Sequence, residues 1–195
     1  MPKYVINLMP VNINKQMGTI DSKKPKILAC DPSFTAWGWA VLQNHQVIDS
    51  GCIKTKPEAK KRRIRQGDDR VRRTSEIILS LMETMGDHTI DFIVSELPHG
   101  SQNAKAAVMI GTVMGILQTF SELWSIPIEW YSENDAKKAL FGRISASKNQ
   151  VIEAVQDTFE VRLMGPKYVR EAVADALAIY NVAHKNSPTL KILTR

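Results

Sequence analysis

Apolar positions along the chain follow two spacings, which together predict a protein of mixed strands and helices. Short apolar runs between turn-forming residues predict five strands, near residues 27–30, 37–42, 47–53, 90–94 and 126–131. Apolar residues that recur every three or four positions predict helices near 71–85, 103–124, 148–159 and 169–184, with a short helix between Ser132 and Gly142. The order of these elements predicts a mixed five-stranded α/β sheet with helices on both faces.

Residues at the expected helix ends support this assignment. Ser132 and Ser147 are typical N-caps, and Gly86 and Gly142 are expected to end helices. The first three strands are close in sequence and form an antiparallel meander, which can share an edge with later parallel strands.

The distribution of polar and apolar residues divides the chain into three regions. Residues 1–25 are polar and weakly patterned, and we expect them to form an N-terminal extension. Residues 26–185 hold the predicted strands and helices and form one domain, because a chain of 195 residues suffices for one well-buried core. Residues 186–195 form a basic C-terminal tail, which we expect to fray after Pro188.

Composition excludes several classes of protein. Hydrophobic residues make up 44% and charged residues 24% of the chain, as in ordinary globular proteins. No uninterrupted apolar run approaches the roughly 20 residues that cross a bilayer, and the N-terminus lacks the pattern of a signal or transit peptide. Cys30 and Cys52 are too few for a disulfide framework and are expected to be small buried side chains. We therefore expect no membrane contact and a cytoplasmic location, whether the gene is cellular or viral.

Positive charge is concentrated in one segment. The net charge is +6, and the segment from Lys54 to Arg73 holds ten Lys or Arg and three acidic residues. Such a segment is usually a solvated face, and its functional interpretation is contact with a polyanion such as nucleic acid. The arginines that we expect to contact DNA are Arg62, Arg63, Arg65, Arg70, Arg72 and Arg73.

Three acidic residues occupy unusual positions in the pattern. Asp31 and Glu96 stand at or just after the C-terminal ends of predicted strands, the edge where ligands bind in open α/β sheets. Asp175 lies within the last apolar helix, where an unpartnered carboxylate is costly to bury. Glu171 is four residues earlier on nearly the same side of that helix, so a cation between the two would relieve their repulsion.

Asp31, Glu96 and Asp175, with Glu171 as a fourth candidate, form a predicted catalytic and metal-binding set. Converging carboxylates serve phosphodiester hydrolysis, because hard oxygen ligands hold two Mg²⁺ ions about 4 Å apart, and Mn²⁺ is an alternative to Mg²⁺. Acids at strand ends are also common loop residues, and separations of 65 and 79 residues define no local motif. Spacing alone therefore leaves an ordinary structural role open.

Four short motifs occur in a set order along the chain. They are Lys26-Ile27-Leu28-Ala29-Cys30-Asp31-Pro32 with Gly38-Trp39-Ala40-Val41, then Ser50-Gly51-Cys52-Ile53-Lys54-Thr55-Lys56, Val94-Ser95-Glu96 and Asp175-Ala176-Leu177-Ala178-Ile179. In this order they resemble the opening strand pair, the third strand, the glutamate-bearing central strand and the closing helix of the RuvC Holliday-junction resolvases. The resemblance covers about residues 26–184 and implies an RNase H-like fold.

The resemblance also implies roles for further residues in DNA binding and assembly. His99 takes the position of an aromatic residue that wedges into the junction in bacterial members. Lys137 and Lys148 match basic residues near the active site, for which a solvated helix face is the alternative. Gly111 and Gly115 fall in the family's subunit-contact region, although small residues four apart also suit packing on a sheet.

Two positions depart from the family pattern. Ser33 replaces the glycine that usually follows Asp-Pro, which puts the conformation of that turn in question. Ala172 stands where a fourth metal ligand is common, three residues before Asp175. Glu171, one position earlier, is the residue that could replace this ligand. These departures suggest a divergent member, for which a phage origin is one interpretation.

The function implied by the resemblance is that of a crossover junction endodeoxyribonuclease. It predicts a Mg²⁺-dependent homodimer that resolves four-way DNA junctions in recombination, repair or phage DNA processing, within a bacterial or phage-infected cytoplasm. Two alternatives remain open, a less selective nuclease of flaps, forks or RNA–DNA hybrids and a non-catalytic junction-binding protein. The actin-like ATPase fold opens with a similar hairpin, but it needs two such domains, for which this chain is too short.

Overall fold

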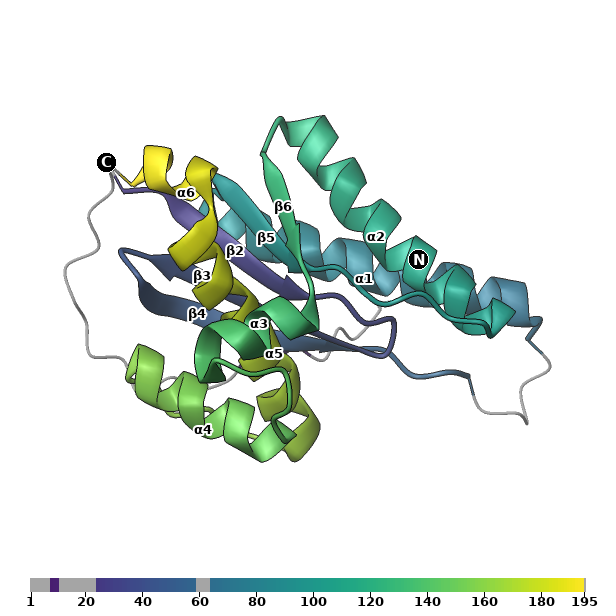
Figure 1. The fold of residues 1–195 in the computed structure, drawn as a ribbon. Helices are drawn as coiled ribbons and strands as arrows, with labels where there is room; N and C mark the ends of the chain where they lie inside the picture. The colour runs from purple at the N-terminus through teal and green to yellow at the C-terminus, as the bar shows by residue number, and fades with distance from the viewer. Residues whose placement is uncertain (1–7, 11–23, 59–63, 195) are drawn as a thin grey trace.

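A computed structural model describes residues 8–10, 24–58 and 64–194 of the chain (Figure 1). The strands are β1 (Leu8–Pro10), β2 (Lys26–Asp31), β3 (Ala36–Gln43), β4 (Gln46–Lys54), β5 (Phe92–Glu96) and β6 (Ile128–Tyr131). The helices are α1 (Gln66–His88), α2 (Ala104–Trp124), α3 (Glu133–Phe141), α4 (Lys148–Phe159), α5 (Lys167–Asn186) and α6 (Pro188–Leu193). The five predicted strands are β2 to β6.

One mixed sheet contains the strands in the order β1-β4-β3-β2-β5-β6. β2, β3 and β4 pair antiparallel as a meander, while β5 is parallel to β2 and β6 is parallel to β5. The predicted five-stranded mixed sheet is confirmed, and β1 extends it by pairing antiparallel with β4. Because β2, β5 and β6 are parallel, their C-terminal ends lie at one edge of the sheet.

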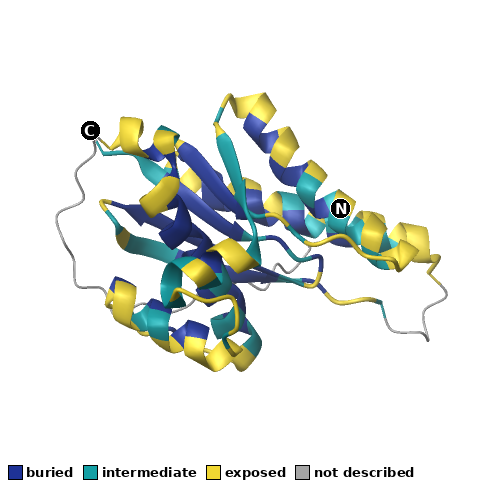
Figure 2. Cartoon of the chain, viewed as in Figure 1, coloured by how far each residue is buried: buried dark blue, intermediate teal, exposed yellow. Residues whose placement is uncertain are grey.

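Helices cover both faces of the sheet, as predicted (Figure 1). On one face α1 and α2 pack against a core that includes Leu28 and Leu117. On the other face α3, α4 and α5 pack against a core that includes Ala29 and Leu177. Leu28 and Ala29 are neighbours in β2 and enter different cores because successive side chains of a strand alternate between faces. Buried residues are accordingly concentrated in the sheet and on the helix faces turned toward it (Figure 2).

Helix α1 is longer at both ends than the apolar spacing predicts. It begins at Gln66. The apolar spacing does not predict this start, because the first turn of the helix is polar and exposed. The prediction that Gly86 ends this helix is wrong, since α1 continues to His88. The helix closes at Thr89, whose left-handed conformation turns its backbone N–H onto the carbonyl of Met85.

The expectation that the chain frays after Pro188 is also wrong, because α6 begins there. The Ser187 hydroxyl accepts a hydrogen bond from the backbone N–H of Leu190 at 2.9 Å and so caps the helix. Leu190 is only 1% exposed and belongs to the core beneath α5. A cap, a proline at the first helical position and one buried side chain hold this segment in place.

Helix α2 has two different faces. Val113 and Leu117 are buried against the sheet, whereas Val108 and Leu123 are 50% and 71% exposed. In the described part of the chain, α2 is the one helix whose length and composition would allow it to cross a membrane, contrary to the sequence expectation. Apolar helices packed in a protein core meet the same criterion, and one face of α2 is packed in this way.

Candidate active site

Two of the predicted acids lie side by side at one edge of the sheet. Asp31 is the last residue of β2 and Glu96 is the last residue of β5, and the final pairing between these parallel strands immediately precedes both. Ala29 and Val94, two residues earlier, enter the core beneath α5. Because side chains two apart in a strand share a face, both carboxylates are directed to the α5 side of the sheet.

Helix α5 brings the third acid, Asp175, to the same edge. Gly38 on β3 pairs with Asp31, and a Cβ atom at Gly38 would stand 2.0 Å from the carbonyl oxygen of Ala172. Only a glycine lets the helix backbone approach the strand this closely. Asp175 follows Ala172 by about one helical turn, so this contact sets the position of Asp175 relative to Asp31.

A small cleft beside these acids contains both acidic and basic groups. The charged residues that line it are Glu96, Glu133, Lys137 and Asp175. The Lys137 ammonium lies 2.7 Å from the carboxylate of Glu133. Lys148, the first residue of α4, places its ammonium 2.5 Å from the carboxylate of Asp175. Two lysines thus face three acids of the cleft and the adjacent Asp31, so acids outnumber bases in the site and it is negative when all four carboxyl groups are ionised.

Burial and mutual repulsion strengthen proton binding by these carboxyl groups. Burial raises the pKa of Glu96 to about 7, and the charges of Asp175 and Glu133 add to this effect. Burial likewise raises the pKa of Asp31 well above its usual value, with repulsion from Glu96 and Asp175. Burial also raises the pKa of Asp175, although Lys148 beside it acts in the opposite direction. A divalent cation would replace such protons and relieve the repulsion.

The donor set fits a hard divalent cation. Carboxylate oxygens are the ligands that Mg²⁺ and Mn²⁺ prefer, and the fold gathers them at one edge of the sheet. Among the described residues, no three His, Cys, Asp or Glu side chains already stand at ligand spacing, and Lys148 engages Asp175. The backbone therefore brings the acids to one edge of the sheet, with Asp175 paired to Lys148.

Glu171 does not line the cleft. Its carboxylate lies 3.7 Å from Lys167, one turn earlier on α5. Its charge makes a minor contribution to the raised pKa of Asp175, behind burial and Lys148. Ala172 is buried beneath its contact with β3 and offers no ligand atom. The two positions that the sequence suggests for a fourth ligand thus lie outside the cleft.

Glu133 is a cleft residue that the sequence analysis missed. It is the first residue of α3, just after β6 ends at Tyr131. Since β6 is parallel to β5, this end of β6 lies at the same sheet edge as Glu96. An acid just past the end of a third predicted strand is the signal that could have found it. That signal is weak, because acids are also common in the first turn of a helix, where they interact favourably with the helix dipole.

The residues that the resemblance assigns to DNA lie around this cleft. Lys137 lines it and Lys148 contacts Asp175. His99 is exposed, and it stands near enough to Glu133 to help Lys137 lower the pKa of that carboxyl. Lys137 and Lys148 thus lie at the acids themselves, and His99 lies near Glu133.

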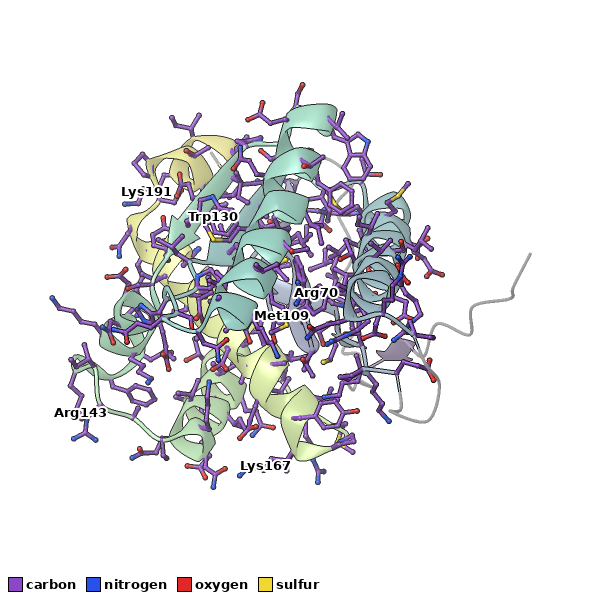
Figure 3. The ribbon with its side chains drawn as sticks, turned by 90° about the vertical axis from the view of Figure 1, so that its right-hand side faces the viewer. Arg70, Met109, Trp130, Arg143, Lys167 and Lys191 are labelled. Atoms are coloured by element: carbon purple, nitrogen blue, oxygen red, sulfur yellow. The ribbon has the colours of Figure 1, made fainter. Side chains whose placement is uncertain are left out.

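The basic segment is only partly available as a phosphate-binding surface. Arg62 and Arg63 lie outside the described residues. The side chain of Arg65 is 87% exposed and pairs with Asp68 at 2.8 Å. Arg70 is half-buried on α1, on the side of the molecule seen in Figure 3.

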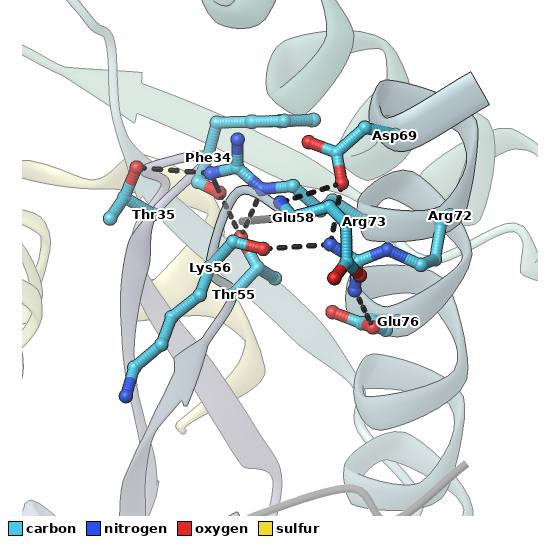
Figure 4. A network of polar contacts seen from close by, with 9 residues as sticks. All are labelled: Phe34, Thr35, Thr55, Lys56, Glu58, Asp69, Arg72, Arg73 and Glu76. Carbon is cyan, nitrogen blue, oxygen red and sulfur yellow. Dashed lines mark hydrogen bonds and ion pairs between the residues drawn. The ribbon is translucent and has the colours of Figure 1, made fainter. Parts of the chain in front are cut away.

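Arg72 is half-buried and bonded within the protein (Figure 4). It pairs with Asp69 and Glu76 on its own helix, and it donates to the carbonyl oxygen of Lys56 at 2.7 Å. A DNA phosphate would have to compete with two carboxylates for this guanidinium.

Arg73 is buried, and the expectation that it contacts DNA is wrong (Figure 4). Only 5% of Arg73 is exposed. The guanidinium donates to the carbonyl oxygen of Phe34 at 3.0 Å and to the hydroxyls of Thr35 and Thr55 at 3.2 and 2.9 Å. It also stacks on the Phe34 ring. Arg73 therefore fastens α1 to the turn that follows Asp31.

Replacing Arg73 by methionine should lower the free energy of unfolding by about 3 kcal/mol, because buried acceptors lose a charged donor. Urea denaturation followed by circular dichroism measures this change. Arg65→Met, at the N-cap position of the same helix, is the control and should cost less than about 0.5 kcal/mol, since its ion pair is exposed. Equal losses in the two variants would show that Arg73 has no special structural role.

Comparison with known proteins gives a consistent match along most of the chain. The family model described as crossover junction endodeoxyribonuclease RuvC matches residues 27–184. The chain is 26% identical over 164 residues to the crossover junction endodeoxyribonuclease RuvC of Ehrlichia ruminantium (strain Welgevonden), an alignment that covers 80% of this chain and 97% of that protein. It is 25% identical over 159 residues to the RuvC of Nitratidesulfovibrio vulgaris, covering 80% of this chain and 90% of that protein.

Solved structures agree in fold. The structure of T. thermophilus RuvC in complex with Holliday junction substrate has a TM-score of 0.65 at 19% identity, covering 82% of this chain and 93% of that chain. The yeast mitochondrial Holliday junction resolvase Ydc2 has a TM-score of 0.56 at 12% identity, covering 87% of this chain and 81% of that chain. At these identities the likeness establishes a common fold.

Proposed function

Because the chain belongs to the RuvC family of crossover junction endodeoxyribonucleases, we propose that its acidic site hydrolyses phosphodiester bonds of four-way DNA junctions with Mg²⁺ as the metal. The observation that carries this proposal is the convergence of Asp31, Glu96 and Asp175 from two strand ends and a helix. These residues are far apart in sequence and come together only through the fold. Mn²⁺ has similar ligand preferences and would substitute.

The residues of the site have separable roles in this reaction. Asp31, Glu96 and Asp175 would hold two divalent ions, which supply an activated water and stabilise the leaving oxygen when bound. Burial lowers the pKa of the Lys148 ammonium, but pairing with Asp175 outweighs this effect and raises it. Lys148 therefore remains a cation that can bind a phosphate oxygen beside the acids. Lys137 lines the cleft from α3 and would do the same.

Contacts with the branch lie further from the reacting bond. His99 is exposed and near Glu133, and it would stack on an unpaired base, although it is smaller than Phe or Tyr. The basic segment from Lys54 to Arg73 would follow the phosphate backbone, with Arg65 and Arg70 as its available described arginines. Arg62 and Arg63 remain predicted contacts.

A gel assay on a synthetic four-way junction tests this function. Cleavage should require Mg²⁺ and should be faster on the four-way junction than on Y-shaped, linear or RNA–DNA hybrid substrates. Binding should weaken steeply between low and physiological salt, because lysine and arginine contacts release counterions. Equal cleavage of all substrates would favour the less selective nuclease, and binding without metal-dependent cleavage would favour a non-catalytic junction-binding protein.

We propose further that two copies of the chain associate through α2. Gly111 and Gly115 are exposed, and Cβ atoms built on them would meet nothing within 4 Å. They therefore do not serve packing on the sheet. With Ala104 and Val108 they form one exposed stripe along the first half of α2, which is the helix facing the viewer in Figure 3. A symmetric pair would present two sites to the two symmetric strands of a junction.

Gly115→Glu should convert the dimer into a monomer, because a charged side chain would enter the proposed close helix contact. Light scattering during size-exclusion chromatography measures the mass. Gly86→Glu on α1 is the matched control, since Gly86 is also an exposed helical glycine with open space around its Cβ position. Unchanged mass in both variants would exclude this stripe as the interface.

A further inference from the structure

A further acidic residue, Glu133, follows a strand at the same edge of the sheet as Asp31 and Glu96. β2, β5 and β6 are consecutive parallel neighbours, and each is followed or ended by an acid at the same edge. Asp31 ends β2, Glu96 ends β5, and Glu133 follows β6. Glu133 therefore extends the row of acids by the same topological rule that brings the other two together.

The start of α3 holds Glu133 in this position. Ser132 caps the helix, and it and Asp135 exchange hydrogen bonds in a capping box. The backbone of Glu133 lies between these two residues, so its position is set by the cap. Its carboxylate is one-third exposed and pairs with Lys137 one turn later, on the wall of the cleft.

Electrostatic contact connects Glu133 to all three predicted ligands. Its charge adds to the effect of burial in raising the pKa values of Glu96, Asp31 and Asp175. Glu171, by contrast, acts in this way on Asp175 and pairs with Lys167. Glu133 also lines the same cleft as Glu96 and Asp175, whereas Glu171 does not.

We propose that Glu133 is the fourth carboxylate of the divalent-metal site, contributed from the start of α3, just after β6, rather than from α5. The proposal rests on the proposed function, since it takes Asp31, Glu96 and Asp175 as the other ligands. It also accounts for Ala172, whose backbone is pressed against β3 and whose side chain has no ligand atom. A carboxylate from α3 supplies the charge that this position of α5 lacks.

Metal binding measured by calorimetry on the full chain separates the candidates for the fourth ligand. Glu133→Gln should weaken Mn²⁺ binding by roughly tenfold or more, whereas Glu171→Gln should change it by less than about twofold. The two variants are matched, because each removes a partly exposed glutamate that pairs with a lysine one turn away on its helix. The Mg²⁺ concentration needed for half-maximal junction cleavage should rise in Glu133→Gln.

Two further variants make each outcome decisive. Glu133→Asp keeps the charge and should bind Mn²⁺ with an affinity between those of the wild type and Glu133→Gln. Asp175→Asn should lose Mn²⁺ binding, as the proposed function requires. Loss in Asp175→Asn with wild-type affinity in Glu133→Gln would overturn the role of Glu133 alone. Wild-type protein that binds no Mn²⁺ would overturn both proposals, and a larger loss in Glu171→Gln than in Glu133→Gln would assign the fourth ligand to Glu171.

Discussion

Asp31→Asn is expected to reduce junction cleavage by roughly a thousandfold or more while leaving junction binding as tight as in the wild type, or tighter. Asparagine is nearly the same size as aspartate, so the strand end and its pairing with Gly38 should persist. The substitution removes a metal ligand and one negative charge from a site that already repels phosphate. Single-turnover cleavage of a labelled four-way junction in Mg²⁺ measures the first effect, and gel mobility in EDTA measures the second.

An exposed aspartate provides the control for this substitution. Asp157 lies on the outer side of α4, and Asp157→Asn should cleave and bind the junction as the wild type does. Cleavage at the wild-type rate by Asp31→Asn would show that the active site lies elsewhere. Loss of both cleavage and binding would instead point to a damaged fold, which denaturation in the absence of metal would reveal.

Acids at strand ends were predictable from the sequence because a strand ending is a local signal. Asp31 and Glu96 terminate short apolar runs, and the parallel pairing of those runs then places them together. Asp175 was predictable for another reason, since a single carboxylate in an apolar helix needs a partner. Glu133 carries the strand-end signal only weakly, because it stands two residues past the end of β6. It follows a strand of four half-buried residues and begins an ordinary capped helix, so only the register of β6 identifies it.

The arginines of the basic segment show the limit of charge as a predictor. Arg72 and Arg73 are adjacent and equally charged, yet one is half-buried and the other is 5% exposed. Arg73 is one helical turn before Ile77 and therefore shares the buried side of α1. The apolar spacing of α1 therefore predicts that Arg73 faces the core, whereas a count of charged residues does not distinguish Arg73 from Arg72. The acceptors that satisfy Arg73 come from β-strand connections far away in sequence and could not be predicted locally.

Gly38→Ala is expected to have the second large effect, a loss of about 3 kcal/mol or more in the free energy of unfolding. The added Cβ would lie 2.0 Å from the carbonyl oxygen of Ala172, and this neighbour is backbone, which cannot rotate away. Either α5 moves outward or β3 bends. Urea denaturation of the metal-free protein measures the cost. Gly67→Ala is the control, because nothing lies within 4 Å of its Cβ position in α1 and alanine favours a helix.

The same substitution tests whether the fold alone assembles the site. Any outward shift of α5 carries Asp175 away from Asp31 and Glu96, whose strand register does not involve the helix. Folded Gly38→Ala should therefore lose Mn²⁺ affinity and junction cleavage together, although no acidic residue has been changed. Wild-type stability and affinity in Gly38→Ala would contradict the close crossing of α5 over β3. Reduced stability with wild-type affinity would mean that Asp175 reaches the metal independently of this contact.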